Sequence, residues 1–301
     1  MTSHLSTRKD GRKDVRVDVF TSGRKDERDA RFVPGAPGCC DVIVLANHKG
    51  GVTKTTSTAN LGAMLAERGR RVLIVDCDPQ ANLSEAFGWT DDLPGERLED
   101  LLTRPAVAAR YRPPVALMPD ITPSPAWREQ LAIIPCTNAL ADTAADLPSA
   151  KGDGYELSLK YVIDAQRESF ELILLDTPPG LGNLSGMALL AADRLLIQAL
   201  AADLDVRGAG KLYDLVEGEI PGLRILGVVI AASERRWRVT RDATRRMDTD
   251  GMRVLPFHVP RAVRVASAPR YRAPTAVLEP DSLVTHAYRR LADHILQELT
   301  A

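Results

Sequence analysis

A glycine-rich run that contains two lysines is the part of this sequence whose residue types and spacing best suit phosphate chemistry. In such a turn the backbone N–H groups converge on phosphate oxygens, and the N-terminus of a following helix adds a favourable dipole. The side chain of Lys54 would reach the β- and γ-phosphates, and the hydroxyl of Thr55 would ligate Mg²⁺. The run therefore predicts a nucleotide-binding site made of Lys49, Gly50, Gly51, Val52, Thr53, Lys54, Thr55 and Thr56.

This run departs from the ordinary phosphate-loop pattern G-x-x-x-x-G-K-[ST], whose two glycines would fall on His48 and Thr53. It keeps Lys54 and Thr55, and it adds a second lysine, Lys49, five residues before Lys54. A β-branched residue tolerates a positive φ poorly. We therefore expect Thr53 either to shift the loop slightly or to weaken nucleotide binding.

Two apolar runs end in aspartate, which places carboxylates where a phosphate-bound cation would need them. Asp76 and Asp78 come after Val72–Val75, and Asp176 comes after Leu172–Leu175. Ligands of a parallel sheet bind at the carboxyl ends of its strands, so we expect all three carboxylates near the phosphates. An aspartate that follows a strand also commonly caps the next turn, and this structural role is the alternative.

Short aliphatic runs alternate with helical stretches from Asp41 onward. This alternation is typical of an α/β domain with a mostly parallel, twisted sheet and helices on both faces. Residues 105–125 are proline-rich and poorly periodic, so we expect a surface excursion there. The strands are expected at residues 41–46, 71–76, 131–135, 171–176, 194–198, 225–230 and 253–257, and three of the helices at 55–68 (ending before Gly69), 157–167 and 282–299.

The first 40 residues differ from the rest, and we expect a disordered, charged tail (1–40) followed by one domain (41–301). The tripeptide Arg-Lys-Asp occurs three times in the tail, with too few apolar residues to bury. No apolar run reaches about 18 residues, so the sequence predicts no transmembrane helix, and the tail lacks the apolar centre of a secretory signal. The four cysteines lack the spacing of zinc ligands and predict thiols in a reducing cytoplasm.

The charge of the chain is unevenly distributed. The formal net charge is -1, yet residues 231–272 contain 11 arginines against four acidic residues, a local balance of +7. Arginine is well suited to phosphate contacts, and a local basic patch is the electrostatic footprint of nucleic-acid binding. A solvated helix face is the alternative explanation.

The nucleotide motifs together resemble the ParA/MinD family of P-loop ATPases, whose deviant Walker A box carries the extra lysine. Residues Asp76–Asn82 are similar to the family's D-x-D-P-Q-x-N segment, and Asp176–Pro179 to its D-T-P-P form of Walker B. Phe257–Pro269 and His286–Ala292 look like segments of ParA-type (Soj-like) partition ATPases. The family usually has glycine at the position of Thr53. The resemblance extends from Asp41 to Leu299 and implies a single P-loop NTPase domain.

The resemblance also implies roles for individual residues. Lys49 would contact the nucleotide bound by the other subunit of an ATP-sandwiching homodimer, and Asp78 would orient the attacking water. Asp76 would support the Mg²⁺ site or its loop, and Gly180 and Gly182 would let the following segment respond to the γ-phosphate. The implied catalytic residues are Lys49, Lys54 and Asp78, the metal ligands are Thr55, Asp76 and Asp176, and the DNA-contacting residues are Arg235, Arg236, Arg238, Arg261 and Arg264.

The implied function is plasmid or chromosome partition by a weakly active ATPase that uses ATP and Mg²⁺. Its ATP-bound homodimer would bind DNA non-specifically, and a ParB-like partner would stimulate hydrolysis and release. Such a protein is cytoplasmic and nucleoid-associated, without membrane contact.

Three alternatives remain open. A ParA-like ATPase could position a cargo other than a replicon, because the partner chooses the cargo. A MinD-like membrane regulator would need a basic amphipathic anchor, whereas residues 292–301 are short and acidic. An iron–sulfur protein related to the nitrogenase iron protein would need paired ligand cysteines, and Cys77 and Cys136 are far apart in the sequence.

Overall fold

The computed structural model describes residues 40–47, 53–90, 93–116, 125–201, 203–233, 237–260 and 272–300. Several predicted residues lie outside these ranges: Lys49, Gly50, Gly51, Val52, Arg235, Arg236, Arg261 and Arg264. The backbone of Arg238 is described, but its side chain is not. The tail expected over residues 1–40 also lies outside, except for Cys40, which is buried.

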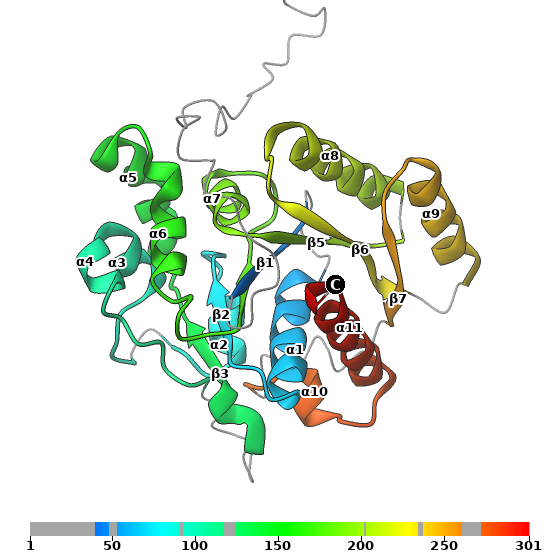
Figure 1. The fold of residues 1–301 in the computed structure, drawn as a ribbon, viewed down its shortest axis with the longest axis horizontal. Coiled ribbons are helices and arrows are strands. Elements are labelled where there is room, and N and C mark those ends of the chain that lie inside the picture. The colour runs from blue at the N-terminus through cyan, green and yellow to red at the C-terminus, as the bar shows by residue number, and fades with distance from the viewer. Residues whose placement is uncertain are drawn as a thin grey trace, which may run out of the picture.

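Seven parallel strands form one sheet within the described residues, in the order β3-β2-β4-β1-β5-β6-β7 (Figure 1). The predicted α/β domain with a mostly parallel sheet is therefore confirmed. The strand bounds are β1 Asp41–Ala46, β2 Val72–Asp76, β3 Leu131–Ile134, β4 Leu172–Asp176, β5 Arg194–Ala199, β6 Arg224–Ser233 and β7 Val254–Pro260.

Helices cover both faces of the sheet. In Figure 1, α7, α8 and α9 lie on one side of β5 and β6, whereas α1, α10 and α11 lie on the other. The helix bounds are α1 Lys54–Glu67, α2 Asn82–Ala86, α3 Leu98–Thr103, α4 Pro105–Ala108, α5 Ala139–Lys151, α6 Ser158–Asp164, α7 Asn183–Ala191, α8 Asp203–Glu219, α9 Trp237–Thr249, α10 Thr275–Leu278 and α11 Leu283–Thr300, with short 3-10 turns at Ala126–Gln130 and Tyr155–Leu157. None of these described helices is long and apolar enough to span a membrane.

The central strands are apolar on both faces because each face is covered. Val42 and Val44 of β1 belong to the core beneath α7 and α8, while Ile43 and Leu45 belong to the core beneath α1 and α11. A strand buried on both sides has no polar alternation, which explains the continuous aliphatic run in the sequence. Within the described residues, Cys40, Cys77 and Cys136 are buried and form no disulfide.

The surface excursion expected over residues 105–125 is confirmed for part of its described residues, since Pro105, Ala106, Ala109, Arg110 and Arg112 are exposed. It begins with the short helix α4, and Ala116 is fully buried. The backbone N–H of Ala116 donates to the carbonyl of Leu131 at 2.8 Å, and the N–H of Ile133 donates to the carbonyl of Pro114 at 3.0 Å. The segment therefore satisfies backbone groups of β3 at the edge of the sheet, which a proline-rich sequence does not reveal.

Helix α1 approaches the sheet closely at Gly62. A Cβ atom at this position would lie 2.9 Å from Cγ2 of Ile74 and 3.4 Å from Cδ1 of Leu131. Both neighbours are fully buried side chains of the sheet. The missing side chain of Gly62 thus sets how deeply the helix that follows the phosphate loop sits on the sheet.

We predict that Gly62→Val lowers the free energy of unfolding by about 2 kcal/mol, because the added side chain overpacks a filled core. Chemical denaturation measures this change. Gly218→Val is the matched control, since nothing lies within 4 Å of a Cβ at Gly218 in α8. Equal effects of the two substitutions would show that the close approach at Gly62 is unimportant.

Candidate functional site

The predicted carboxylates and Lys54 meet at one edge of the sheet, at the carboxyl ends of β1, β2 and β4. Asp76 and Asp176 are register partners on neighbouring strands, and Leu45 of β1 pairs with Asp176 on its other side. Helix α1 begins at Lys54, a few residues after β1 ends. The sheet order thus brings together motifs that lie up to about 120 residues apart, as expected for a parallel sheet.

Lys54 is buried, with 6% of its surface exposed. Burial lowers the pKa of its ammonium group, while the charges of Asp176 and Asp78 oppose that decrease. A buried ammonium group is costly unless it is paired, so these carboxylates stabilise the lysine inside the fold. The charge predicted to contact phosphates is therefore held at the site before any nucleotide arrives.

Asp176 is fully buried and only partly satisfied. Its Oδ1 accepts a hydrogen bond from Oγ1 of Thr58 at 3.4 Å, and the Thr55 side chain also donates to this carboxylate. Its Oδ2 has no hydrogen-bond partner among the described residues. Burial, reinforced by repulsion from Asp76, raises the pKa of Asp176 well above its usual value. An unsatisfied, buried carboxylate oxygen next to a threonine hydroxyl fits the oxygen ligand set that Mg²⁺ takes.

Asp76 uses both of its oxygens within the fold. Oδ2 accepts hydrogen bonds from the backbone N–H and the hydroxyl of Ser84, at 2.8 and 2.7 Å, and Oδ1 accepts one from the N–H of Asp78 at 3.2 Å. Burial raises the pKa of Asp76 to about 6, although the bonds from Ser84 act in the opposite direction. Of the two roles expected for Asp76, loop support is the one that these contacts favour. Its role as a metal ligand stays a prediction.

The turn that carries Asp78 is held from the neighbouring strand. Oδ1 of Asp78 accepts a hydrogen bond from the N–H of Gln80 at 3.0 Å, which is the turn-capping contact of the structural alternative. The thiol of Cys136 donates to the carbonyl of Asp78 at 3.1 Å, and the N–H of Cys136 donates to Oγ of Ser84 at 3.0 Å. Sequence reasoning missed Ser84 and Cys136 because neither belongs to a spacing pattern.

Thr53 adopts the left-handed conformation, with φ 65° and ψ 22°, at the start of α1. Its hydroxyl makes no capping hydrogen bond, and Oγ1 is buried without a partner among the described residues. A β-branched residue in this region is strained by about 1–3 kcal/mol. Thr53 therefore does adopt the positive φ that a β-branched residue tolerates poorly. Its effect on nucleotide binding stays a prediction.

The segment after β4 is fixed at its start. The Thr177 hydroxyl donates to the carbonyl of Leu45 at 2.8 Å and joins β4 to β1. Of the two glycines expected to give freedom, Gly180 has a φ of 88°, which favours glycine, while Gly182 has a φ of -76° and caps α7. The need for glycine is therefore evident at Gly180 alone.

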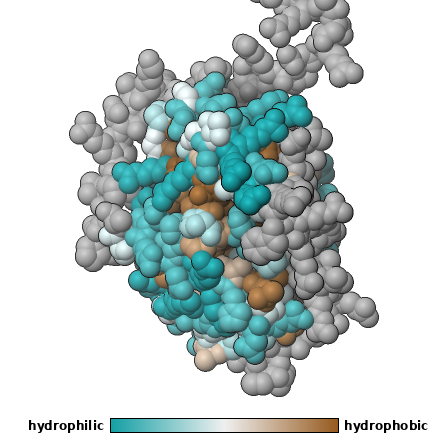
Figure 2. Space-filling model, turned by 90° about the vertical axis from the view of Figure 1, so that its right-hand side faces the viewer, coloured by the Kyte–Doolittle hydropathy of each residue, from teal (hydrophilic) through white to brown (hydrophobic). Residues whose placement is uncertain are grey.

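The basic region is only partly within the described residues. Arg241, Arg245 and Arg246 are exposed on α9, whereas Arg253 pairs with Glu298 through two contacts of 3.0 and 2.7 Å. Figure 2 faces this end of the molecule and shows mostly hydrophilic residues around a smaller hydrophobic area. The local balance of +7 thus overstates the free positive charge, since Arg253 is neutralised within the fold.

Comparison with known proteins gives concordant results. A family described as an AAA domain matches residues 40–220. The chromosome-partitioning ATPase Soj of Thermus thermophilus is 33% identical over 265 residues, covering 84% of this chain and 94% of that protein. The chromosome partitioning protein ParA of Caulobacter vibrioides is 30% identical over 264 residues, covering 85% and 93%.

A solved structure agrees with these relatives. It is that of the cobyrinic acid a,c-diamide synthase of Mycobacterium smegmatis with an ATP analogue and magnesium. It superposes with a TM-score of 0.71 at 28% identity, covering 87% of this chain and 96% of that one. We call the edge of the sheet that holds Lys54, Asp76 and Asp176 the nucleotide edge. It occurs in a fold for which binding of an ATP analogue with magnesium has been observed.

We predict that Thr53→Gly raises the free energy of unfolding of the nucleotide-free protein by about 0.5–1 kcal/mol, because relief of strain exceeds the entropic cost of glycine. Gly69→Thr is the reciprocal control. It places a threonine at a φ of 77° where nothing lies within 4 Å. Denaturant unfolding should show the two changes moving in opposite directions, and a loss of stability in Thr53→Gly would contradict the assigned strain.

Proposed function

The chain belongs to the ParA/MinD family of deviant Walker A P-loop ATPases, and from this premise we propose that it is an ATP-dependent partition ATPase for a plasmid or chromosome. The observation that carries the proposal is the arrangement of Lys54, Asp78 and Asp176 at the carboxyl edge of the sheet. The relatives named as partitioning proteins match nearly the whole described chain, which supports the same role.

ATP and Mg²⁺ are the ligands that suit this edge. The hydroxyl of Thr55 and the carboxylate of Asp176, which already hydrogen-bond to each other, would hold the cation. Bound Mg²⁺ would neutralise charge on the phosphate oxygens. Lys54 would bind the β- and γ-phosphates from its buried position, while Asp76 keeps the turn that carries Asp78 in place.

Hydrolysis in this proposal is mainly a matter of positioning. Asp78 would orient the attacking water, and Lys49 would reach the nucleotide of the second subunit in an ATP-bound homodimer. Without that second subunit the site lacks one of its two lysines, so we propose that turnover by the isolated subunit is weak. A ParB-like partner would stimulate hydrolysis and so end DNA binding.

DNA binding would use the arginine-rich segment that includes α9. Arg241 and Arg245 are four residues apart and exposed, so they share one face of the helix. Arg235, Arg236, Arg238, Arg261 and Arg264 would extend this surface. Attraction to phosphates without base readout is salt-dependent and independent of sequence. The protein would accordingly be cytoplasmic and associated with the nucleoid.

The two lysines separate nucleotide binding from dimer-dependent turnover. We predict that Lys54→Ala lowers the affinity for ATP at least about tenfold, since a charged contact to phosphate is lost. Lys49→Ala should retain ATP binding and lose turnover that depends on dimerisation. Titration calorimetry and phosphate release measure the two effects. Normal turnover in both variants would reject the proposed mechanism.

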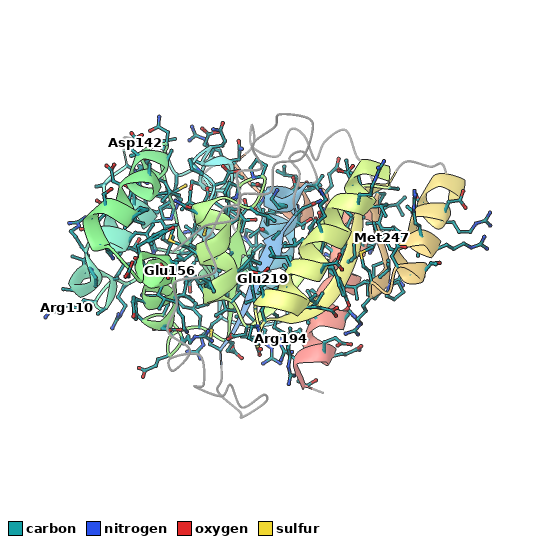
Figure 3. The ribbon with its side chains drawn as sticks, turned by 90° about the horizontal axis from the view of Figure 1, so that it is seen from above. Arg110, Asp142, Glu156, Arg194, Glu219 and Met247 are labelled. Atoms are coloured by element: carbon teal, nitrogen blue, oxygen red, sulfur yellow. The ribbon has the colours of Figure 1, made fainter. Side chains whose placement is uncertain are left out.

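A charge-reversal pair tests the DNA surface. We predict that Arg241→Glu combined with Arg245→Glu weakens non-specific DNA binding at least tenfold in the presence of ATP and flattens its dependence on salt, because fewer phosphate contacts release counterions. Arg110→Glu combined with Arg112→Glu changes the net charge equally at the opposite end of the molecule, where Figure 3 places Arg110 far from Met247 of α9. Equal loss in both double variants would indicate a general charge effect and contradict a surface on α9.

A further inference from the structure

Four buried polar side chains form a connected chain beside the nucleotide edge. Asn47 follows β1, Ser57 lies in α1, Gln198 lies in β5 and Tyr288 lies in α11. Each of them is at most 1% exposed. Their hydrogen bonds join residues separated by between 141 and 231 positions in the sequence. The chain of contacts therefore links four elements that only the tertiary structure brings together.

The direction of these hydrogen bonds follows from the number of protons available. Oγ of Ser57 donates its single proton to Oε1 of Gln198 at 2.9 Å. The Tyr288 hydroxyl lies 2.8 Å from the same Oγ, so Tyr288 must be the donor in that contact. The side-chain amide of Asn47 donates to the backbone carbonyl of Gln198. Tyr288 thus donates to Ser57, and Ser57 donates to Gln198; we call this pair of hydrogen bonds the relay. Asn47 donates to the backbone of the same glutamine in β5.

The relay reaches both ends of the phosphate loop. Asn47 is the last described residue before the predicted loop, and Ser57 lies three residues after Lys54 in the first turn of α1. The N–H of Ser57 also donates to the carbonyl of Thr53 at 2.8 Å. Gln198 therefore contacts Asn47, which lies before the loop, and Ser57, which lies in the helix turn after it.

Core packing alone does not account for this choice of residues. Buried polar groups cost free energy unless every donor and acceptor is paired, and apolar side chains of similar shape would avoid that cost. The relay is not fully paired, because Nε2 of Gln198 has no hydrogen-bond partner among the described residues. Burial also raises the pKa of Tyr288, so its hydroxyl keeps the proton that it donates. A partly satisfied polar network in the core calls for a role beyond packing.

We propose that Tyr288, Ser57 and Gln198 are positioning residues for the phosphate loop, so that the C-terminal helix α11 sets the affinity for nucleotide. This inference rests on the proposed binding of Mg²⁺-ATP. None of the three side chains needs to touch the nucleotide. The relay acts by fixing where the loop begins, at Asn47, and where α1 begins, at Lys54.

The far end of α1, which also contacts α11, provides a control. There Arg289 contacts Glu67 through two hydrogen bonds of 3.1 Å, and Arg68 contacts Asp293 at 2.8 and 3.1 Å. These ion pairs also join α1 to α11, but their residues in α1 lie nearly four turns from Lys54. Glu67→Gln weakens the same helix contact without touching the relay.

The experiment compares Tyr288→Phe, Ser57→Ala and their combination with Glu67→Gln in the full chain. Two quantities are measured well below the unfolding temperature: the Kd of Mg²⁺-ATP, and hydrogen exchange of the nucleotide-free peptide spanning residues 46–56. We expect Kd to rise about threefold to tenfold in the relay variants, the size of one hydrogen bond, with faster exchange in that peptide.

The double variant should bind Mg²⁺-ATP no more weakly than Ser57→Ala, because both substitutions break one relay. Glu67→Gln should lower the unfolding temperature and leave Kd and exchange unchanged.

Two results would overturn the inference. One is a Kd and a loop exchange rate in Tyr288→Phe and Ser57→Ala that match the wild type. The other is an equal change in Glu67→Gln, which would reduce the relay to ordinary helix packing. Failure of the wild type to bind Mg²⁺-ATP would instead reject the proposed function, and the exchange measurement would still decide whether the relay orders the loop. Gln198→Met provides a second test at the centre of the relay and should behave like Ser57→Ala.

Discussion

The electrostatic attraction between a buried lysine and carboxylates at the ends of two different strands is the interaction on which the nucleotide edge depends. Lys54 is placed at the start of α1 in surroundings that disfavour its charge, and the charges of Asp176 and Asp78 offset that penalty. The carboxylates repel one another in turn, which raises the pKa of Asp76 and Asp176 beyond the effect of burial. Such a cluster holds excess negative charge, and a bound cation would stabilise it.

Hydrogen bonds and close packing from neighbouring elements hold this cluster of charged side chains in place. Asp76 keeps the turn that contains Asp78 in place through the N–H of Asp78 and both donors of Ser84. Gly62 lets α1 sit close to Ile74, and the relay that ends at Tyr288 joins the first turn of α1 to α11. Residues that perform no chemistry thus determine where the reactive side chains are.

The distribution of charge supports the proposal that a chain of net charge -1 binds DNA reversibly. The acidic side chains of the nucleotide edge lie at the carboxyl ends of β2 and β4, whereas the exposed arginines of α9 lie beyond β6 and β7 at one end of the sheet (Figure 1). Arg253 is withdrawn from this surface by Glu298. A modest and spatially separate basic surface would give attraction that is weak enough to be reversed.

Much of the fold could be predicted because local patterns specify it. Short aliphatic runs identified the seven described strands to within a few residues, and the alternation with helices identified the parallel sheet. The sequence predicted a surface segment here and missed the bonding of Pro114–Ala116 to β3, since that role lies in backbone bonds rather than in side chains. The motifs likewise predicted that Lys54, Asp78 and Asp176 lie together, because phosphate chemistry requires those residue types close to strand ends.

The sequence by itself therefore predicted the strands, the family and the candidate site residues, all of which depend on short-range spacing. The tertiary structure alone decided the strand order that makes Asp76 and Asp176 neighbours, and the left-handed backbone of Thr53. It also decided the contacts of Ser84, Cys136, Gln198 and Tyr288 with residues far away in the chain. The physical reason is that burial and hydrogen bonding depend on which distant segments pack together, and no local spacing pattern records that choice.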